Sequence, residues 1–205
     1  MKKITLLIIF SLLNSFNLFS AEEDVEEIVT IGSQIKGAKI TGALPVTVIS
    51  SEDIDVIGAA DGDELIDNLV EQGMNFFNEN EQVSGGVNAA RGDVGAYNLR
   101  NMGVGNTLSL LNGRRLVNNA GYQTEYIGGD FVPTLTVNTN SIPVNGLDRL
   151  EVLKDGASAL YGADAVAGVV NNVLDNDFVG TRMQFRSGGI ESLDAKDNTF
   201  SVKHG

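Results

Sequence analysis

The sequence predicts an α+β domain with a small mixed sheet, two short helices and long glycine-rich loops, followed by two further strands. Three observations lead to this fold class. Glycine is abundant, with 24 residues, and tryptophan is absent, a composition that favours turns over helix bundles. Helical periodicity is confined to two short stretches. Strand-like runs recur between glycine-rich segments from residue 46 to residue 202.

Residues 1–21 have the features of a cleaved export signal. Two lysines precede an apolar run, and Ser20-Ala21 supplies small residues before an acidic start. An uncleaved membrane anchor is the alternative, but polar residues interrupt the run and a spanning helix needs about 20 mostly apolar residues. Cleavage would remove two lysines and no acid, so that 12 basic residues face 27 acidic ones, a balance of −15. This charge argues against nucleic acid as a partner.

The predicted domain begins at residue 44. Residues 46–49 form a β-prone run, and Ser51 is a suitable N-cap for a short helix. A second helix is predicted from Asp61 to about residue 71, because its apolar positions have helical spacing. Gly73 stands where a glycine often ends a helix.

The middle of the chain combines two long loops with predicted strands. Residues 75–91 and 118–140 are polar and rich in glycine, which indicates loops. Strands are predicted at 97–100, and at 107–111 and 114–117, the last two joined by Asn112-Gly113, a strong hairpin-turn signal.

The last part of the domain is a strand, a turn, a small-residue segment and a second strand. Residues 148–154 alternate in polarity, Asp155-Gly156 predicts a turn, and 169–173 is rich in β-branched residues. Residues 181–187 and 199–202 then alternate polar and apolar positions, as strands of transmembrane barrels do.

Four segments, in order, resemble the plug domain of TonB-dependent outer-membrane receptors. They are EEIVTIG at 26–32, NLRNMG at 98–103, TLSLLNGRRLV at 107–117 and DRLEVLKDGASALYGADAVAGVVNNV at 148–173. Asn101 stands where the family has glycine. The resemblance implies a signal peptide at 1–21, a periplasmic segment with a TonB box and linker at 22–43, a plug at 44–176, and the start of an incomplete β-barrel at 177–205.

The resemblance implies that the box binds TonB, the energy-coupling partner. An extended segment can add as a strand to a partner's sheet edge, with backbone hydrogen bonds supplying the grip. The residues are Glu27, Ile28, Val29, Thr30 and Ile31. The alternative is that they form the first edge strand of the plug.

Four charged residues are expected to contact the enclosing barrel of the same receptor. Arg100, Arg115 and Arg149, with Glu151 nearby, lie in predicted strands. The guanidinium group suits reversible ion pairs with acids of a barrel wall. The alternative is that they are solvated strand residues.

The loops at 78–93 and 118–136 are expected to face a ligand. Candidate contacts are Glu81, Gln82, Asn88, Tyr122 and Tyr126, although each of them also fits an ordinary surface loop. The implied ligand is a scarce nutrient such as a siderophore, a vitamin or an oligosaccharide.

Neither catalysis nor a cofactor is predicted. The chain has one histidine and no cysteine, which disfavours a transition-metal site, and its acidic runs are explained by helix capping and turns. The function implied by the resemblance is gated uptake across the outer membrane, with the box facing the periplasm. The alternatives are a free-standing periplasmic ligand-binding module and an inactive truncated fragment.

Overall fold

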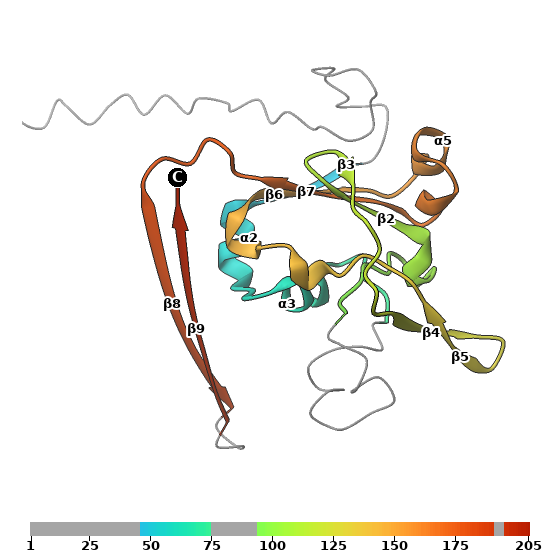
Figure 1. The fold of residues 1–205 in the computed structure, drawn as a ribbon, viewed down its shortest axis with the longest axis horizontal. Helices are drawn as coiled ribbons and strands as arrows, with labels where there is room; N and C mark the ends of the chain where they lie inside the picture. The colour runs from blue at the N-terminus through green and yellow to red at the C-terminus, as the bar shows by residue number, and fades with distance from the viewer. Residues whose placement is uncertain (1–45, 75–93, 191–194) are drawn as a thin grey trace, which may run out of the picture.

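The computed structural model describes residues 46–74, 94–190 and 195–205, and its centre is a mixed sheet (Figure 1). The strand order is β1-β6-β7-β2-β3. β6 (Leu147–Leu153) pairs antiparallel with both β1 (Val46–Ser50) and β7 (Gly168–Leu174), whereas β7 runs parallel to β2 (Thr107–Leu111). The predicted α+β class with a small mixed sheet is confirmed.

Both faces of this sheet are covered. Leu150, Val152 and Val170 pack with Ile66 and Leu69 on one face. The opposite face has its own cluster, made of Leu108, Leu110, Leu153, Ala157, Ala165 and Val169. The expectation that β6 is amphipathic is therefore wrong, because side chains on both of its faces are buried, as is usual for sheets with covered faces.

Gly168 opens β7 at a close approach between strands. Its φ is 147°, and a Cβ there would lie 2.5 Å from the carbonyl oxygen of Leu153 on β6. Any side chain would push these two central strands apart, so the position requires glycine.

The first helix, α2 (Ser51–Ile57), begins one residue earlier than the sequence predicts. Its N-cap is Ser50, whose hydroxyl accepts from the Asp53 amide, while the Asp53 carboxylate accepts from the Ser50 amide. This is a complete capping box. Hydrogen bonds from the side chain and backbone of Ser50 also lower the pKa of Asp53.

The second helix is shorter than predicted. α3 (Gly62–Asp67) is capped by Asp61, as expected, but it ends at Asn68 instead of continuing to residue 71. The Asn68 side chain donates to the Glu64 carbonyl, the acceptor that the next helical N–H would use. Gly73 does not end this helix, and its amide donates to the Asn98 carbonyl.

The small-residue segment contains a third short helix that sequence periodicity did not predict. α5 (Ala157–Tyr161) is followed by the 3-10 turn η5 (Ala163–Ala165). Five residues are too few for a helical period to emerge from the pattern. Further 3-10 turns are η2 (Val104–Asn106), η3 (Thr139–Ser141) and η4 (Val144–Gly146).

The predicted strand at 97–100 is wrong. Leu99 forms only an isolated bridge with Gln72, and Arg100 and Asn101 both have φ of 56°. This left-handed backbone cannot continue a strand. Asparagine tolerates it better than most residues, which explains how Asn101 replaces the glycine of the family pattern.

The loop predicted at 118–140 contains a hairpin. β4 (Gln123–Ile127) pairs with β5 (Asp130–Thr134) through Gly128-Gly129, both with positive φ. Two glycines between β-prone runs are a hairpin signal. The Asn112-Gly113 turn between β2 and β3 (Arg114–Arg115) is confirmed, although β3 is shorter than predicted.

The last two strands form a long hairpin beside the helices. β8 (Thr181–Ile190) pairs antiparallel with β9 (Ala195–His204). Figure 1 shows the hairpin alongside α2 and α3, separate from the five-stranded sheet. Both predicted alternating segments, 181–187 and 199–202, lie in these strands.

Candidate functional site

Three basic side chains attach the β8–β9 hairpin to the domain. Arg182 pairs with Asp55 of α2 at 2.5 Å, and Arg186 pairs with Glu64 of α3 at 3.3 Å. Lys203 pairs with Asp175 at 2.5 Å, and its ammonium also lies 4.5 Å from the ring centre of Phe178. In these three pairs the cations are on the hairpin and the acids are on the domain.

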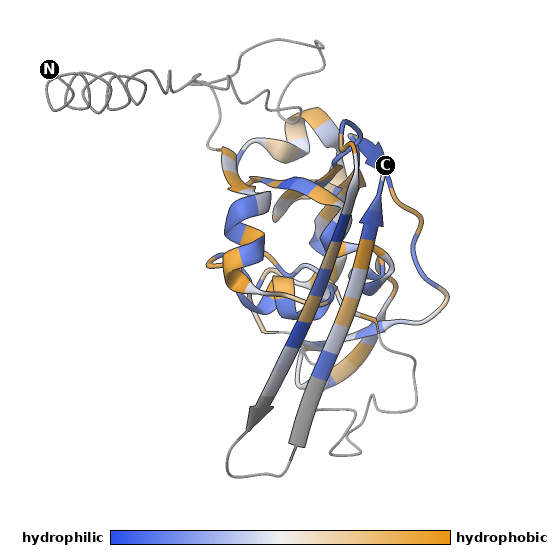
Figure 2. Ribbon diagram, turned by 90° about the vertical axis from the view of Figure 1, so that its left-hand side faces the viewer, coloured by the Kyte–Doolittle hydropathy of each residue, from blue (hydrophilic) through white to orange (hydrophobic). Residues whose placement is uncertain are grey.

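The other face of the hairpin is apolar and exposed. Met183 lies opposite Val202, and Phe185 lies opposite Phe200. All four side chains are more than half exposed. Figure 2 shows the resulting alternation of polar and apolar residues along both strands. The charged side chains of the hairpin thus face the domain, and its apolar side chains face away from it.

Arg100 does not contact the hairpin, and instead joins three parts of the sheet region. Its guanidinium donates to Asp155 Oδ1 at 3.1 Å and to the carbonyls of Lys154 and Ala167, each at 2.9 Å. The left-handed turn at 100–101 therefore fixes the ends of β6 and β7.

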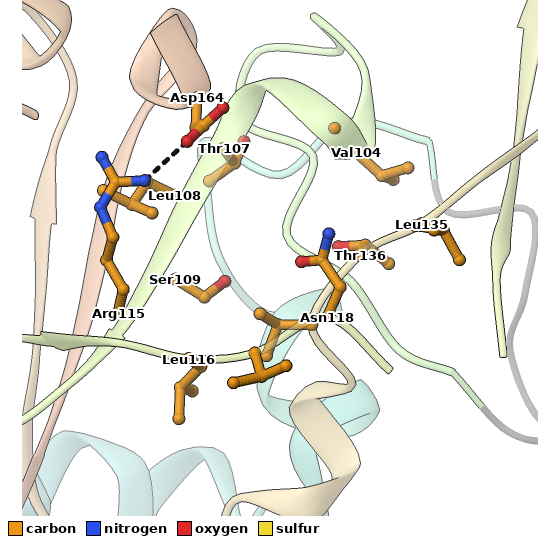
Figure 3. Close-up of a pocket in the computed structure, with 13 residues that line it drawn as sticks. Val104, Thr107, Leu108, Ser109, Arg115, Leu116, Asn118, Leu135, Thr136 and Asp164 are labelled. Carbon is orange, nitrogen blue, oxygen red and sulfur yellow. Dashed lines mark hydrogen bonds and ion pairs between the residues drawn. The ribbon is translucent and has the colours of Figure 1, made fainter. Parts of the chain in front are cut away.

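Arg115 borders an open cavity of about 410 Å³ (Figure 3). It pairs with Asp164 at 2.6 Å and also donates to the Tyr161 carbonyl. These contacts connect β3 to the α5–η5 segment. Val117 and Leu135, both mostly exposed, form part of the cavity lining.

Arg149 and Glu151 belong to a buried polar network inside the sheet. Arg149 Nε donates to Glu151 Oε1 at 2.9 Å, and Asn171 Nδ2 donates to Glu151 Oε2 at 2.9 Å. The Asn171 carbonyl oxygen accepts from the Gly113 amide. Glu151 is 0% exposed, so in this arrangement its carboxylate does not reach the surface of the domain. The predicted contacts of these four residues with a barrel stay predictions.

Asn172, the next residue of β7, forms a separate set of hydrogen bonds on the opposite face of the sheet. Its side chain donates to the Leu110 carbonyl and accepts from the buried hydroxyl of Tyr97 at 2.9 Å. Burial raises the pKa of Tyr97. Both asparagine side chains of β7 therefore donate and accept hydrogen bonds inside the domain.

Among the predicted ligand-facing residues, Tyr126 lines a second cavity. This cavity, about 340 Å³, lies between β4 and the turn at 98–106. The Tyr126 ring packs against Phe131 with a centroid distance of 5.3 Å. Tyr122 precedes β4 and does not line the cavity. Glu81, Gln82, Asn88 and the box at 27–31 lie outside the described residues.

Several functional residues escaped sequence reasoning. Asp55, Glu64 and Asp175 hold the hairpin, yet in the sequence they are ordinary helix and turn acids. A hint existed for the hairpin, since its three cations fall on the polar positions of the alternating segments.

No group of three or more His, Asp or Glu side chains in residues 46–74, 94–190 and 195–205 is arranged to hold a metal ion. Within the same described part of the chain, no helix is long and apolar enough to cross a membrane.

Comparison with solved structures finds the same fold in siderophore receptors. The ferric enterobactin receptor of Pseudomonas aeruginosa, in complex with enterobactin, matches with a TM-score of 0.52 and 20% identity. The siderophore receptor PirA from Acinetobacter baumannii matches with a TM-score of 0.51 and 21% identity. In each case the match covers 78% of this chain and 22% of the other, so this chain spans about a fifth of their length.

Comparison with protein families identifies one that extends over most of the domain. Residues 38–169 match the model of the TonB-dependent receptor plug domain. The match includes the five-stranded sheet up to the start of β7, the turn at 100–101 and the Tyr126 cavity. The chain belongs to the family of TonB-dependent receptor plug domains.

Proposed function

We propose that this domain is the plug of an outer-membrane receptor, where it gates the energised uptake of a scarce nutrient such as a siderophore, a vitamin or an oligosaccharide. The role is not enzymatic and uses no cofactor. The observation that carries the proposal, beyond the family itself, is the β8–β9 hairpin. It binds the domain through cations and turns four apolar side chains outward.

This arrangement suits a wall strand between a polar plug and lipid. Barrel strands place apolar residues toward lipid and polar residues toward the lumen. The hairpin's free backbone edges would need neighbouring strands in a membrane, and the enclosing barrel of the same receptor would supply them. A free-standing periplasmic module would leave the apolar face in water. Residues 177–205 accordingly remain our candidate for the start of the barrel.

Gating would begin at β1. The proposed TonB box at 27–31 precedes this strand, and a pull on it from the periplasm would reach Val46 first. In the described structure, β1 lies at the edge of the sheet and pairs with β6 from Val46–Leu153 to Ser50–Arg149. Hydrogen bonds of an edge strand can break one after another, so β1 is the segment that we expect to leave first.

A disulfide between β1 and β6 tests this proposal. The chain has no cysteine, so Thr47→Cys with Val152→Cys, which are Cα partners, would form a defined bond. Uptake is measured in cells for a ferric siderophore, cobalamin and an oligosaccharide. We expect uptake to stop under oxidising conditions and to return on reduction. Gln184→Cys with Ser201→Cys, partners within the hairpin, is the matched control and should leave uptake unchanged. Continued uptake with the first bond closed would refute gating through β1.

A proline in the box tests the coupling to TonB. Val29→Pro removes a backbone donor that strand addition requires, so we expect loss of uptake and of cross-linking to TonB. Val29→Ala keeps the N–H and should retain most of both. Equal uptake by the two variants would show that this segment is not the box.

A further inference from the structure

The cavity beside Tyr126 has a chemical character that bears on the ligand. Its lining combines four large apolar or aromatic side chains, Met74, Met102, Tyr126 and Ile127, with polar groups from the turn and from β4. Each of the four is more than 40% exposed. The packing of Tyr126 against Phe131 limits its freedom, so its ring is available as a flat surface.

Some of the polar groups are used to build the cavity. Asn98, 5% exposed, donates to the Met74 carbonyl and accepts from the Gly103 amide. Asn101 accepts from the Met74 amide. These hydrogen bonds connect Met74 to the turn at 98–103, and they hold the floor of the cavity in place.

Other polar groups keep acceptor capacity toward the cavity. Asn106 donates its amide hydrogen to the Met102 carbonyl, which leaves its own carbonyl oxygen as an acceptor. Glu125 accepts from the Gly105 amide through Oε1, and an ionised carboxylate has a second oxygen with lone pairs to offer. The position of Glu125 is closely fitted, since a Cβ on Gly103 would lie 2.6 Å from Oε1.

Positive charge is absent from the lining that the structure describes. The nearest arginine in sequence, Arg100, directs its guanidinium to Asp155 and two carbonyls of the sheet. Glu125 is the one charged residue of this described lining. A carboxylate or phenolate entering the cavity would therefore meet the like charge of Glu125 with no cation in the described lining to offset it.

Resting on the proposed function, we propose that the Tyr126 cavity binds a ligand group without negative charge, one that donates hydrogen bonds from an apolar or aromatic body, such as an amine or a primary amide. Glu125 and Asn106 accept these hydrogen bonds. The apolar or aromatic body of the ligand packs against Met74, Met102, Tyr126 and Ile127. This chemistry disfavours anionic chelates as the group held here.

Methionine labelling provides the test. The chain has four methionines, at positions 1, 74, 102 and 183, so ¹³C-methyl labelling gives two probes in the cavity and one on the distant hairpin. The purified chain is titrated with phenylethylamine, phenylacetamide and phenylacetate, which share a ring and differ in the charge of the head group. We expect the first two to shift the methyl signals of Met74 and Met102 and to leave Met183 unmoved. Phenylacetate should bind at least about tenfold more weakly, because a like charge near Glu125 is repelled.

A conservative variant of Glu125 tests whether its charge, rather than its size, determines which compounds bind. Glu125→Gln keeps an oxygen for the Gly105 amide and removes the charge, so it should bring the affinity for phenylacetate close to that for phenylacetamide. An unfolding midpoint in urea equal to that of the unaltered chain shows that the variant is folded. Tighter or equal binding of phenylacetate by the unaltered chain would overturn the proposal, and so would a lack of shift with all three compounds. Neither result touches the gating role, which the β1–β6 disulfide tests independently.

Discussion

The five-stranded sheet and the β8–β9 hairpin both contain polar residues between apolar ones, but the sheet buries residues of both kinds, whereas the hairpin exposes its apolar side chains. In the sheet, Leu150, Val152 and Val170 are buried together with Glu151 and Asn171. In the hairpin, the apolar side chains are the exposed ones, and Arg182, Arg186 and Lys203 make the contacts with the domain.

This difference indicates that apolar burial stabilises the sheet, whereas ion pairs attach the hairpin. Burial of apolar surface depends little on salt, whereas partly exposed ion pairs are screened by it. The sheet should therefore fold as a cooperative unit that ionic strength barely affects. The attachment of the hairpin should be weak, reversible and sensitive to salt, which suits a contact that must break if the plug moves within a barrel.

The largest effect is expected inside the sheet. Glu151→Ala removes the buried carboxylate that pairs with Arg149 and that accepts from Asn171. The guanidinium of Arg149, 15% exposed, keeps its second pair, with the partly exposed Asp148 at 2.5 Å. Loss of one partner of a buried ion pair costs about 3–5 kcal/mol when the other charge is left alone, so we expect a loss near the lower end of this range. The measurement is the free energy of unfolding in urea. Asp155→Ala, which breaks the exposed pair with Arg100, is the control and should cost less than about 1 kcal/mol. Similar losses in the two variants would mean that burial does not distinguish these pairs.

A smaller effect, with a definite pH dependence, is expected for Tyr97. Its hydroxyl is buried on Asn172, and burial raises its pKa above the usual value near 10. The unfolded chain would thus lose this proton at lower pH than the folded one, so its contribution to stability is complete below pH ~10 and falls above it. Tyr97→Phe should cost about 1 kcal/mol at neutral pH and should flatten the alkaline decline.

The matched control for Tyr97 is Tyr126→Phe, which removes a hydroxyl from a side chain that is 60% exposed. Its stability at neutral pH should stay within about 0.5 kcal/mol of the unaltered chain. An alkaline decline of unchanged steepness in Tyr97→Phe would contradict the link between this buried hydroxyl and folding.

The sequence predicted those parts of the fold that local chemistry determines. The Asn112-Gly113 turn, the Asp61 cap and the strands of the final hairpin each depend on residues close in sequence. The β4–β5 hairpin could also have been predicted, since Gly128-Gly129 separates two β-prone runs. The early end of α3 depends on the single side-chain bond of Asn68, which no periodicity reveals.

The candidate site was less predictable, because its contacts are long-range. The arginine positions were identified, but the acids that pair with them, Asp155 and Asp164, come from distant turns. The pair Arg182–Asp55 joins residues 127 positions apart. The sequence shows which residues are charged, but only the tertiary structure determines which acid pairs with which base.

The smallest effect concerns the ion pairs of the hairpin, and it distinguishes the two regions most directly. We expect a double-mutant cycle on Arg182→Ala and Asp55→Ala to give a coupling energy of about 0.2–1 kcal/mol. Both side chains are more than one third exposed, so the coupling should decrease steeply between low salt and 1 M NaCl, where the screening length is about 3 Å. Urea is the suitable denaturant because it carries no charge. Phe185→Ala, on the outward face, should change stability in solution by no more than about 0.5 kcal/mol. A coupling that persists in 1 M salt, or a large loss in Phe185→Ala, would show that apolar contacts hold the hairpin, and the contrast between the two regions would then be wrong.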